Sequence, residues 1–194
     1  MAVDVIEPGD DLVRSLSAMA GIGQLPENVA FRRISEQGTL AGQSLDFIYS
    51  WSVFHRIEFE QFPAIVANFC DLLRPGGGAL IQIAPLYHSA QGALLGEFGL
   101  GNWEHLLLPH EAIRERVLTH PTADAHRKHA AWRYFESQNR ITAADVKALF
   151  HESGFYLLRH REVFDTDTPP VELLREHSKE TLTRNQVVFL FAKA

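Results

Sequence analysis

The stretch that decides the fold is LLRPGGGALIQIA, residues 72–84, where an apolar helix meets an apolar strand. From Gln61 to Leu73, apolar residues recur at the spacing of one helix face. Arg74-Pro75-Gly76-Gly77-Gly78 ends this helix, because proline cannot continue it and glycine adopts positive φ angles. The almost continuously apolar run at 79–84 is typical of a strand buried on both faces. The sequence therefore predicts a helix, a tight turn and a central strand.

The first third of the chain repeats this alternation. Residues 3–6, 29–34 and 45–50 are β-branched or apolar runs, which predict three earlier strands. A helix from Asp10 to Met19 is predicted after the first of them, since its apolar residues share one face. Strands and helices that alternate with short loops indicate a mostly parallel sheet covered by helices.

The end of the chain carries a different signal. A helix over 143–152 is predicted because Thr142 is a good N-cap and Gly154 a good stop. Two strands, at 155–164 and 186–193, then follow without a long helical crossover. Parallel strands need such a crossover, so an antiparallel pair at one edge of the sheet is expected.

The composition excludes several classes of protein. The chain has 194 residues and a net charge of −6, which argues against a nucleic-acid partner bound through net positive charge. The single cysteine, Cys70, excludes an intramolecular disulfide and a cysteine-rich zinc site, and it is interpreted as a core residue. No signal peptide and no apolar run of about 18–20 residues is evident. We therefore expect a cytoplasmic protein without a membrane or nucleic-acid partner.

Three segments resemble the class I S-adenosylmethionine-dependent methyltransferases, and together they cover nearly the whole chain. Val5-Ile6-Glu7-Pro8 is similar to the second strand of that family, residues 45–55 to the fourth strand and its turn, and residues 72–78 to the turn into the fifth strand. The resemblance implies an α/β, Rossmann-like sheet of strand order 3-2-1-4-5-7-6. Such a sheet is mostly parallel with an antiparallel C-terminal hairpin strand, and here it would form a single domain, 1–194.

The resemblance also implies S-adenosylmethionine as the cofactor, bound across the ends of strands 1, 2 and 4. Glu7 would accept hydrogen bonds from the ribose hydroxyls, as an ionised carboxylate does. Ser35 or Glu36 would lie near the adenine amino group. The implied cofactor-binding residues are Glu7, Pro8, Ser35, Glu36, Ser50, Trp51 and His55.

The segment after the fifth strand, residues 86–140, is interpreted as a substrate loop and helical insert. Tyr87 and Trp103 are the candidate substrate contacts. His88 and His105 are candidate general bases for an oxygen or nitrogen nucleophile, because histidine titrates near neutral pH. The implied reaction is methyl transfer to O, N or C of a small molecule, such as a sugar or secondary metabolite.

The chain departs from the family ahead of Glu7. The first strand and its glycine-rich GxGxG turn should precede that residue, where only six residues stand. Three explanations are open: a fragment, a natural truncation that no longer binds cofactor, or completion of the sheet by a second copy or partner chain. We therefore expect an N-terminally truncated sheet. The alternative to a methyltransferase is a non-catalytic, methyltransferase-like remnant or subunit that binds a partner chain.

Other chemistries have weaker support. His126 and His129 share a helix face, but no cysteine or carboxylate cluster completes a ligand set, so no metal site is predicted. Ser52 lacks the GxSxG context of a hydrolase. Glu7 would equally suit a nucleotide-binding oxidoreductase, whereas the Arg-Pro-Gly-Gly turn and the antiparallel tail favour the methyltransferase.

Overall fold

The computed structural model of the protein describes residues 2–4, 31–33 and 44–194. The chain divides into two compact units, Met1–Gln43 and Ser44–Ala194. The expectation of a single domain, 1–194, stays a prediction.

The first unit contains a parallel pair of strands. Strand β1 (Ala2–Asp4) pairs with β2 (Phe31–Arg33), with Val3 opposite Arg32. Strand β2 lies within the expected strand region 29–34, whereas β1 begins before the expected region 3–6 and overlaps it at residues 3 and 4. Their pairing matches the neighbouring second and third strands that the resemblance implies.

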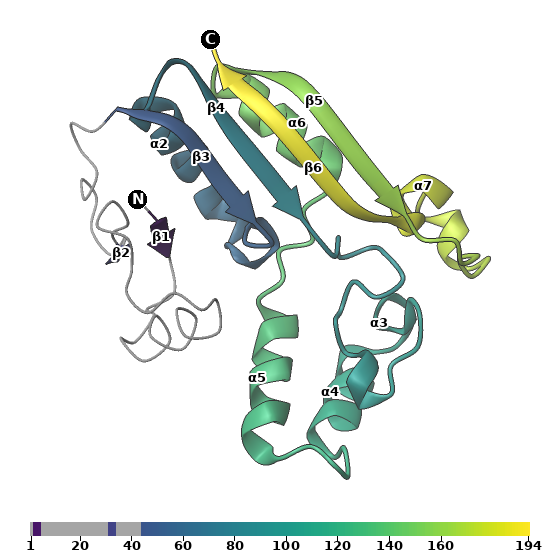
Figure 1. Cartoon of the computed structure of the whole chain (residues 1–194). Helices are drawn as coiled ribbons and strands as arrows, with labels where there is room; N and C mark the ends of the chain where they lie inside the picture. Colours follow the sequence, from purple (N-terminus) through teal and green to yellow (C-terminus); the bar gives the residue numbers. More distant parts are fainter. Residues whose placement is uncertain (1, 5–30, 34–43) are drawn as a thin grey trace, which may run out of the picture. The chain divides into compact units, whose positions relative to one another are not determined.

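The second unit is built on a four-stranded sheet in the order β3-β4-β6-β5 (Figure 1). Strands β3 (Leu45–Trp51) and β4 (Leu73–Ile83) are parallel. Strand β6 (Arg184–Lys193) is antiparallel both to β4 and to β5 (Phe155–Phe164). This is the 4-5-7-6 part of the implied order, so the α/β fold class with an antiparallel C-terminal hairpin is confirmed.

Strand β4 begins earlier than the sequence predicts. Leu73 already pairs with Leu45, and regular pairing resumes between Phe47 and Gly78, so the intervening turn bulges out of the strand. Gly76 in this turn has a φ of +72°. A Cβ on Gly78 would lie 2.9 Å from the ring of Phe47, so the Phe47 side chain would have to shift. The positive φ favours glycine at position 76, and the close approach of the Phe47 ring favours it at position 78.

Two helices cover one face of this sheet, α2 (Phe62–Leu72) and α6 (Ala143–Glu152), and both lie behind it in Figure 1. The bounds of α6 are those expected from the sequence. The Thr142 side chain accepts a hydrogen bond from the Asp145 N–H, and the Asp145 carboxylate accepts one from the Thr142 N–H. This capping box fixes the start of α6, and Gly154 follows its end with a φ of +85°.

The main hydrophobic core fills the space between the sheet and these helices. The Phe150 and Phe191 rings stack with centroids 4.2 Å apart, which ties α6 to β6. Cys70 is half-buried at the margin of this core. Fully buried members of the core include Phe54, Phe62, Val66, Ile81, Val146, Phe150, Phe189 and Phe191.

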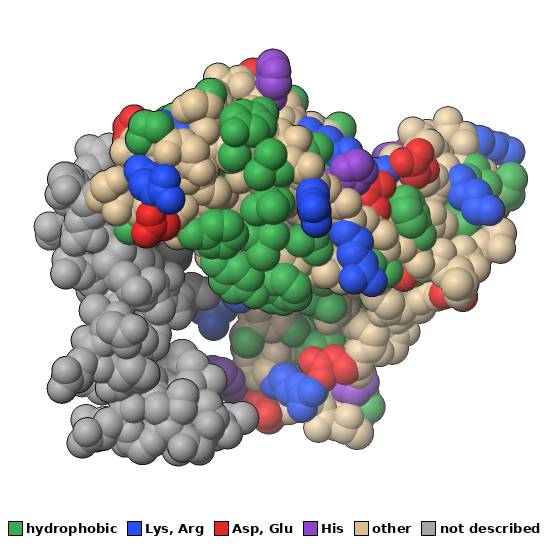
Figure 2. All heavy atoms as spheres, turned by 45° about the horizontal axis from the view of Figure 1, so that its top comes forward, with side chains coloured by type: hydrophobic (Ala, Val, Ile, Leu, Met, Phe, Trp, Pro, Cys, Tyr) green, Lys and Arg blue, Asp and Glu red, His purple; other side chains and the backbone are tan. Residues whose placement is uncertain are grey.

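The other face of the sheet, here called the open face, carries apolar side chains that no helix of the described residues covers. On β3, Phe47, Tyr49 and Trp51 are 51%, 60% and 49% exposed. Figure 2 shows apolar side chains gathered into a patch on this face. The open face consists of Phe47, Tyr49, Trp51, Leu80, Tyr156, Val188 and Leu190.

A helical insert lies between β4 and α6, within the expected range 86–140. It contains α3 (Glu104–Leu107), α4 (His110–Leu118) and α5 (Ala125–Glu136). The insert has its own core, made of Tyr87, Phe98, Ile113, Val117, Trp132 and Phe135. Within the part of the chain that the structure describes, no helix combines the length and apolar character needed to cross a membrane.

Candidate functional site

The turn after β3 is held in an unusual conformation by its neighbour strand. Ser52 has a φ of +53°, in the left-handed region that few residues other than glycine adopt. Gln82 of β4 stabilises it, because its Oε1 accepts hydrogen bonds from both the N–H and the Oγ–H of Ser52, each 2.8 Å long. Backbone strain of this kind costs about 1–3 kcal/mol and is common at binding sites.

Three of the predicted cofactor residues lie at or near this turn. Ser50 is buried in β3, whereas the Trp51 ring is half exposed and stacks on Tyr49 with centroids 5.7 Å apart. His55 is buried in the short 3-10 helix η1 (Phe54–Arg56) that follows. The other four predicted cofactor residues lie outside the described residues: Glu7, Pro8, Ser35 and Glu36.

His55 is uncharged at neutral pH, and only one of its ring nitrogens has a hydrogen-bond partner among the described residues. Its Nε2 lies 2.7 Å from the hydroxyl of Tyr134 on α5. Burial, and to a smaller extent the charge of Arg56, lowers the pKa of His55 to about 4. The Nδ1 atom is buried and has no hydrogen-bond partner among the described residues. Buried polar atoms are nearly always paired, so this atom is expected to pair with water or with a group outside the described residues.

A second group of polar residues follows β4, here called the Tyr87 cluster: Tyr87, His88, His105, Arg140 and His177. The rings of Tyr87 and His105 lie with centroids 5.2 Å apart, and His88 lies 5.4 Å from Tyr87. His105 Nε2 is 2.7 Å from the Tyr87 carbonyl oxygen. The Arg140 guanidinium lies 5.0 Å from the centroid of the Tyr87 ring. The structure thus brings together both predicted general bases and one predicted substrate contact.

The surroundings of His88 and His105 favour their neutral forms. Burial, with smaller effects of His177, His105 and Arg140, lowers the pKa of His88 to about 4, and Asp145 acts weakly in the opposite direction. Burial also lowers the pKa of His105 and raises that of Tyr87. A neutral imidazole has a lone pair that can accept a proton from an O–H or N–H group at neutral pH.

The Trp103 side chain is buried beside α7 (Lys179–Thr183) and is not a member of the Tyr87 cluster. Its indole N–H donates a 3.0 Å hydrogen bond to the Leu182 carbonyl on α7. It packs with Ala90 and Leu173. These contacts make Trp103 a packing residue between α3 and α7, and its predicted contact with substrate stays a prediction.

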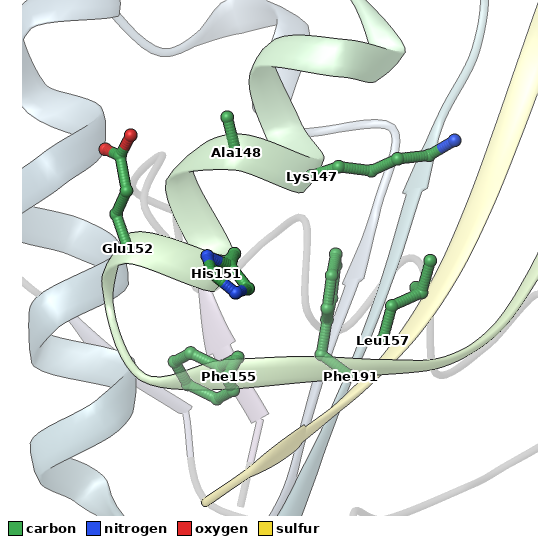
Figure 3. A pocket seen from close by; sticks show the side chains of 7 residues that line it. All are labelled: Lys147, Ala148, His151, Glu152, Phe155, Leu157 and Phe191. Atoms are coloured by element: carbon green, nitrogen blue, oxygen red, sulfur yellow. The ribbon is translucent and has the colours of Figure 1, made fainter.

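One cavity of the described residues lies away from these groups. A cavity of about 400 Å³ opens between α6 and β5 (Figure 3). A much smaller one, about 10 Å³, lies beside His88. Nowhere in residues 2–4, 31–33 and 44–194 do three His, Cys, Asp or Glu side chains gather closely enough to hold a metal ion.

No protein-family model and no curated protein sequence matches the chain. Several solved structures do match. An S-adenosylmethionine-dependent methyltransferase from Mesorhizobium loti has a TM-score of 0.52 at 13% identity, over 98% of this chain and 78% of that chain. The cyclopropane synthase MmaA2 from Mycobacterium tuberculosis has a TM-score of 0.51 at 14% identity, over 93% and 67%. A candidate sarcosine dimethylglycine methyltransferase from Galdieria sulphuraria has a TM-score of 0.54 at 12% identity, over 99% and 68%.

The chain has a class I methyltransferase fold. At these identities the likeness is one of fold alone. The chain spans 68%, 49%, 52% and 64% of the lengths of four of the similar structures. In this methyltransferase fold, the Trp51–Ser52 turn and the Tyr87 cluster follow the carboxyl ends of the two parallel strands, which is where open α/β sheets bind ligands.

Four residues of these groups were missed by the sequence reasoning: Gln82, Tyr134, Arg140 and His177. A polar residue inside an otherwise apolar strand is a signal that could have identified Gln82. Tyr134 gives no such signal, because it meets His55 across 79 positions of sequence. Only the folded chain makes that proximity visible.

Proposed function

We propose that this chain binds S-adenosylmethionine and transfers its methyl group to an O, N or C atom of a small molecule, such as a sugar or secondary metabolite. The observation that carries the proposal is the position of two polar groups at the ligand-binding edge of a methyltransferase fold. One is the Trp51–Ser52 turn with His55, and the other is the Tyr87 cluster.

The residues at the turn fit the adenosine half of this molecule. The half-exposed ring of Trp51 offers a flat apolar surface on which a purine can stack. Glu7, the residue predicted to hold the ribose, lies outside the described residues.

The Tyr87 cluster fits the acceptor side of the reaction. S-Adenosylmethionine supplies a methyl group on a sulfonium, whose sulfur leaves as a neutral thioether. One ring nitrogen of the neutral His88 accepts the proton that an O–H or N–H acceptor loses. The Arg140 cation and the Tyr87 ring orient the acceptor, and orientation alone supplies much of the acceleration of such a displacement.

The direct test is calorimetric titration of the chain with S-adenosylhomocysteine. We expect saturable one-to-one binding. Trp51→Ala should weaken it about tenfold, because stacking of a base on an aromatic ring contributes about 1–3 kcal/mol. Tyr156→Ala is the matched control, since both side chains are 49% exposed on the open face. The absence of binding by a folded chain would contradict the proposal.

The second candidate function is that of a non-catalytic, methyltransferase-like subunit that binds a partner chain. The exposure of three aromatic residues on β3 favours it, because apolar patches of this kind often mark interfaces. Sedimentation of the chain alone and with S-adenosylhomocysteine separates the two functions. A folded chain that self-associates through the open face and does not bind the ligand would support this second candidate.

A further inference from the structure

A groove lies along the free edge of the sheet at β5. This strand is the last in the order, so its outer edge has no strand partner among the described residues. The cavity of about 400 Å³ opens beside it, between the strand and α6 (Figure 3). We call the edge and the cavity together the β5 groove. A free strand edge presents unpaired backbone N–H and C=O groups, which can pair with another chain.

The groove has an apolar floor and a polar rim. Phe155 and Phe191 are buried beneath it, while Leu157 of β5 is 38% exposed. Ala148 of α6 lines the cavity from an exposed position. These residues leave room for one apolar side chain entering from solvent.

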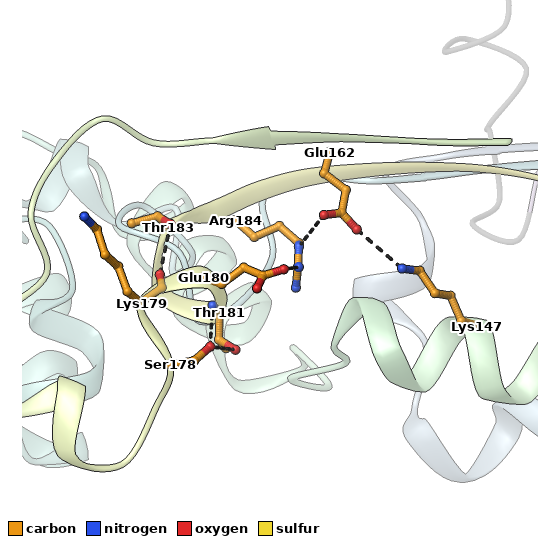
Figure 4. A network of polar contacts seen from close by, with 8 residues as sticks. All are labelled: Lys147, Glu162, Ser178, Lys179, Glu180, Thr181, Thr183 and Arg184. Carbon is orange, nitrogen blue, oxygen red and sulfur yellow. Dashed lines mark hydrogen bonds and ion pairs between the residues drawn. The ribbon is translucent and has the colours of Figure 1, made fainter.

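The rim carries a chain of ion pairs that joins α6, β5 and β6. Lys147 of α6 lies 3.5 Å from Glu162 of β5, and Glu162 lies 3.2 Å from Arg184 of β6 (Figure 4). The Glu162 and Arg184 side chains are each only 15% exposed. The spacing between α6 and β5 is therefore held on the side of the cavity that faces α7.

Two arginines give β5 a positive charge on the face opposite to the cavity. Arg159 and Arg161 pair with Leu190 and Val188 of β6. Paired residues share a face of the sheet, and the alternate residue Phe189 points into the core, so both arginines point to the open-face side. Within the described ranges neither arginine forms an ion pair. The chain as a whole has a net charge of −6, so this strand is a local exception.

The positive charge of β5 distinguishes two possible occupants of the β5 groove, a second copy of this chain and a strand of another protein. An antiparallel pairing of β5 with a second copy of itself would bring Arg159 and Arg161 beside their own copies. Like charges opposite one another destabilise a strand pair, whereas opposite charges contribute about 0.2–1 kcal/mol each. The charges therefore favour an acidic strand from a different protein.

We propose that the β5 groove binds an extended acidic peptide segment of a partner protein. The segment adds a strand beside β5, inserts an apolar side chain over Leu157 into the cavity, and presents acidic side chains to Arg159 and Arg161. In this mode the backbone hydrogen bonds provide affinity, and the cavity and the two charges provide specificity. The inference is independent of methyl transfer.

The test uses the labelled peptide EVEFEVE, which alternates acidic and apolar side chains as an added strand requires. Fluorescence anisotropy measures its binding to the full chain. We expect saturable binding, and binding at least tenfold weaker for the charge-reversed peptide KVKFKVK. No saturable binding of EVEFEVE at millimolar concentration, or equal binding of both peptides, would overturn the proposal.

Two variants locate the peptide on the chain. Ala148→Trp fills the cavity from an exposed helix position, and Arg161→Glu reverses one charge; each should weaken binding about tenfold. Arg133→Glu on α5 is the control for charge reversal at an exposed position and should leave binding unchanged. Circular dichroism checks that each variant is folded. Unchanged binding by Ala148→Trp would overturn the proposal, and so would a dimer of the wild-type chain that this variant abolishes, since the groove would then hold a second copy.

Discussion

The two faces of the sheet differ sharply, although the same strands build both. On the face covered by α2 and α6, Ile81 and Phe189 are 0% exposed, whereas on the open face Tyr49 and Trp51 are 60% and 49% exposed. Successive side chains of a strand point to opposite faces, and buried residues accordingly alternate with more exposed ones along β6 from Val187 to Phe191. Sheets with parallel strands are usually buried on both faces. The covered face therefore holds the fold together, and binding is to be sought on the open face and at the carboxyl ends of its strands.

The largest effect is expected from the covered face. Phe150→Ala removes a fully buried ring that stacks on Phe191, and we expect the free energy of unfolding to fall by about 3–5 kcal/mol. Tyr156→Ala on the open face should cost less than about 1 kcal/mol. Urea denaturation measures both. Equal losses for the two variants would show that the faces do not differ as described.

Protonation of the buried His55 should make the free energy of unfolding depend on pH. The pKa of His55 is about 4 in the folded chain and about 6.5 when unfolded, so the unfolded chain binds the proton more tightly. Stability is then complete above about pH 6.5 and declines as the pH falls toward 4. When the pH falls from about 7.5 to about 5, protonation of His55 should lower the free energy of unfolding by about 2 kcal/mol.

His55→Gln isolates this contribution, because glutamine keeps a hydrogen-bonding group near Tyr134 and does not titrate. Urea denaturation at the two pH values should give a pH dependence smaller by about 2 kcal/mol than in the wild-type chain. His88 has a similarly low pKa and remains in both proteins. An unaltered pH dependence would contradict the assignment of a low pKa to His55.

A smaller loss of stability is expected from the N-cap of α6. Thr142→Ala removes the hydroxyl that accepts a hydrogen bond from the Asp145 N–H, and we expect a loss of about 1 kcal/mol in the free energy of unfolding. Thr142→Ser keeps the hydroxyl and should keep most of the stability. Thermal denaturation of the two variants compares them, and equal losses would argue against the capping box.

The sequence predicted those elements of the fold whose signals are local. Helix α6 and strand β5 have the expected bounds, because a cap, a glycine stop and an apolar run mark their ends. The start of β4 was missed, since it depends on the pairing of Leu73 with Leu45 rather than on residues nearby. Strand order followed from the resemblance, because no local signal says which strands are neighbours.

The candidate site divides in the same way. Tyr87 and His88 were identified because they directly follow a predicted strand, and the structure brings His105 to them. Arg140 joins them only through the packing of the insert against β4, which periodicity does not reveal. Trp103 has the aromatic character expected of a substrate contact, and its burial became visible only in the folded chain.

The measurement that tests the central claim most directly is hydrogen–deuterium exchange of the chain with and without saturating S-adenosylhomocysteine. We expect slower exchange at residues 51–56 and 84–89, which follow the carboxyl ends of β3 and β4, and unchanged exchange along β5. No change in a folded chain, or protection confined to β5, would contradict the assignment of ligand binding to this edge of the sheet.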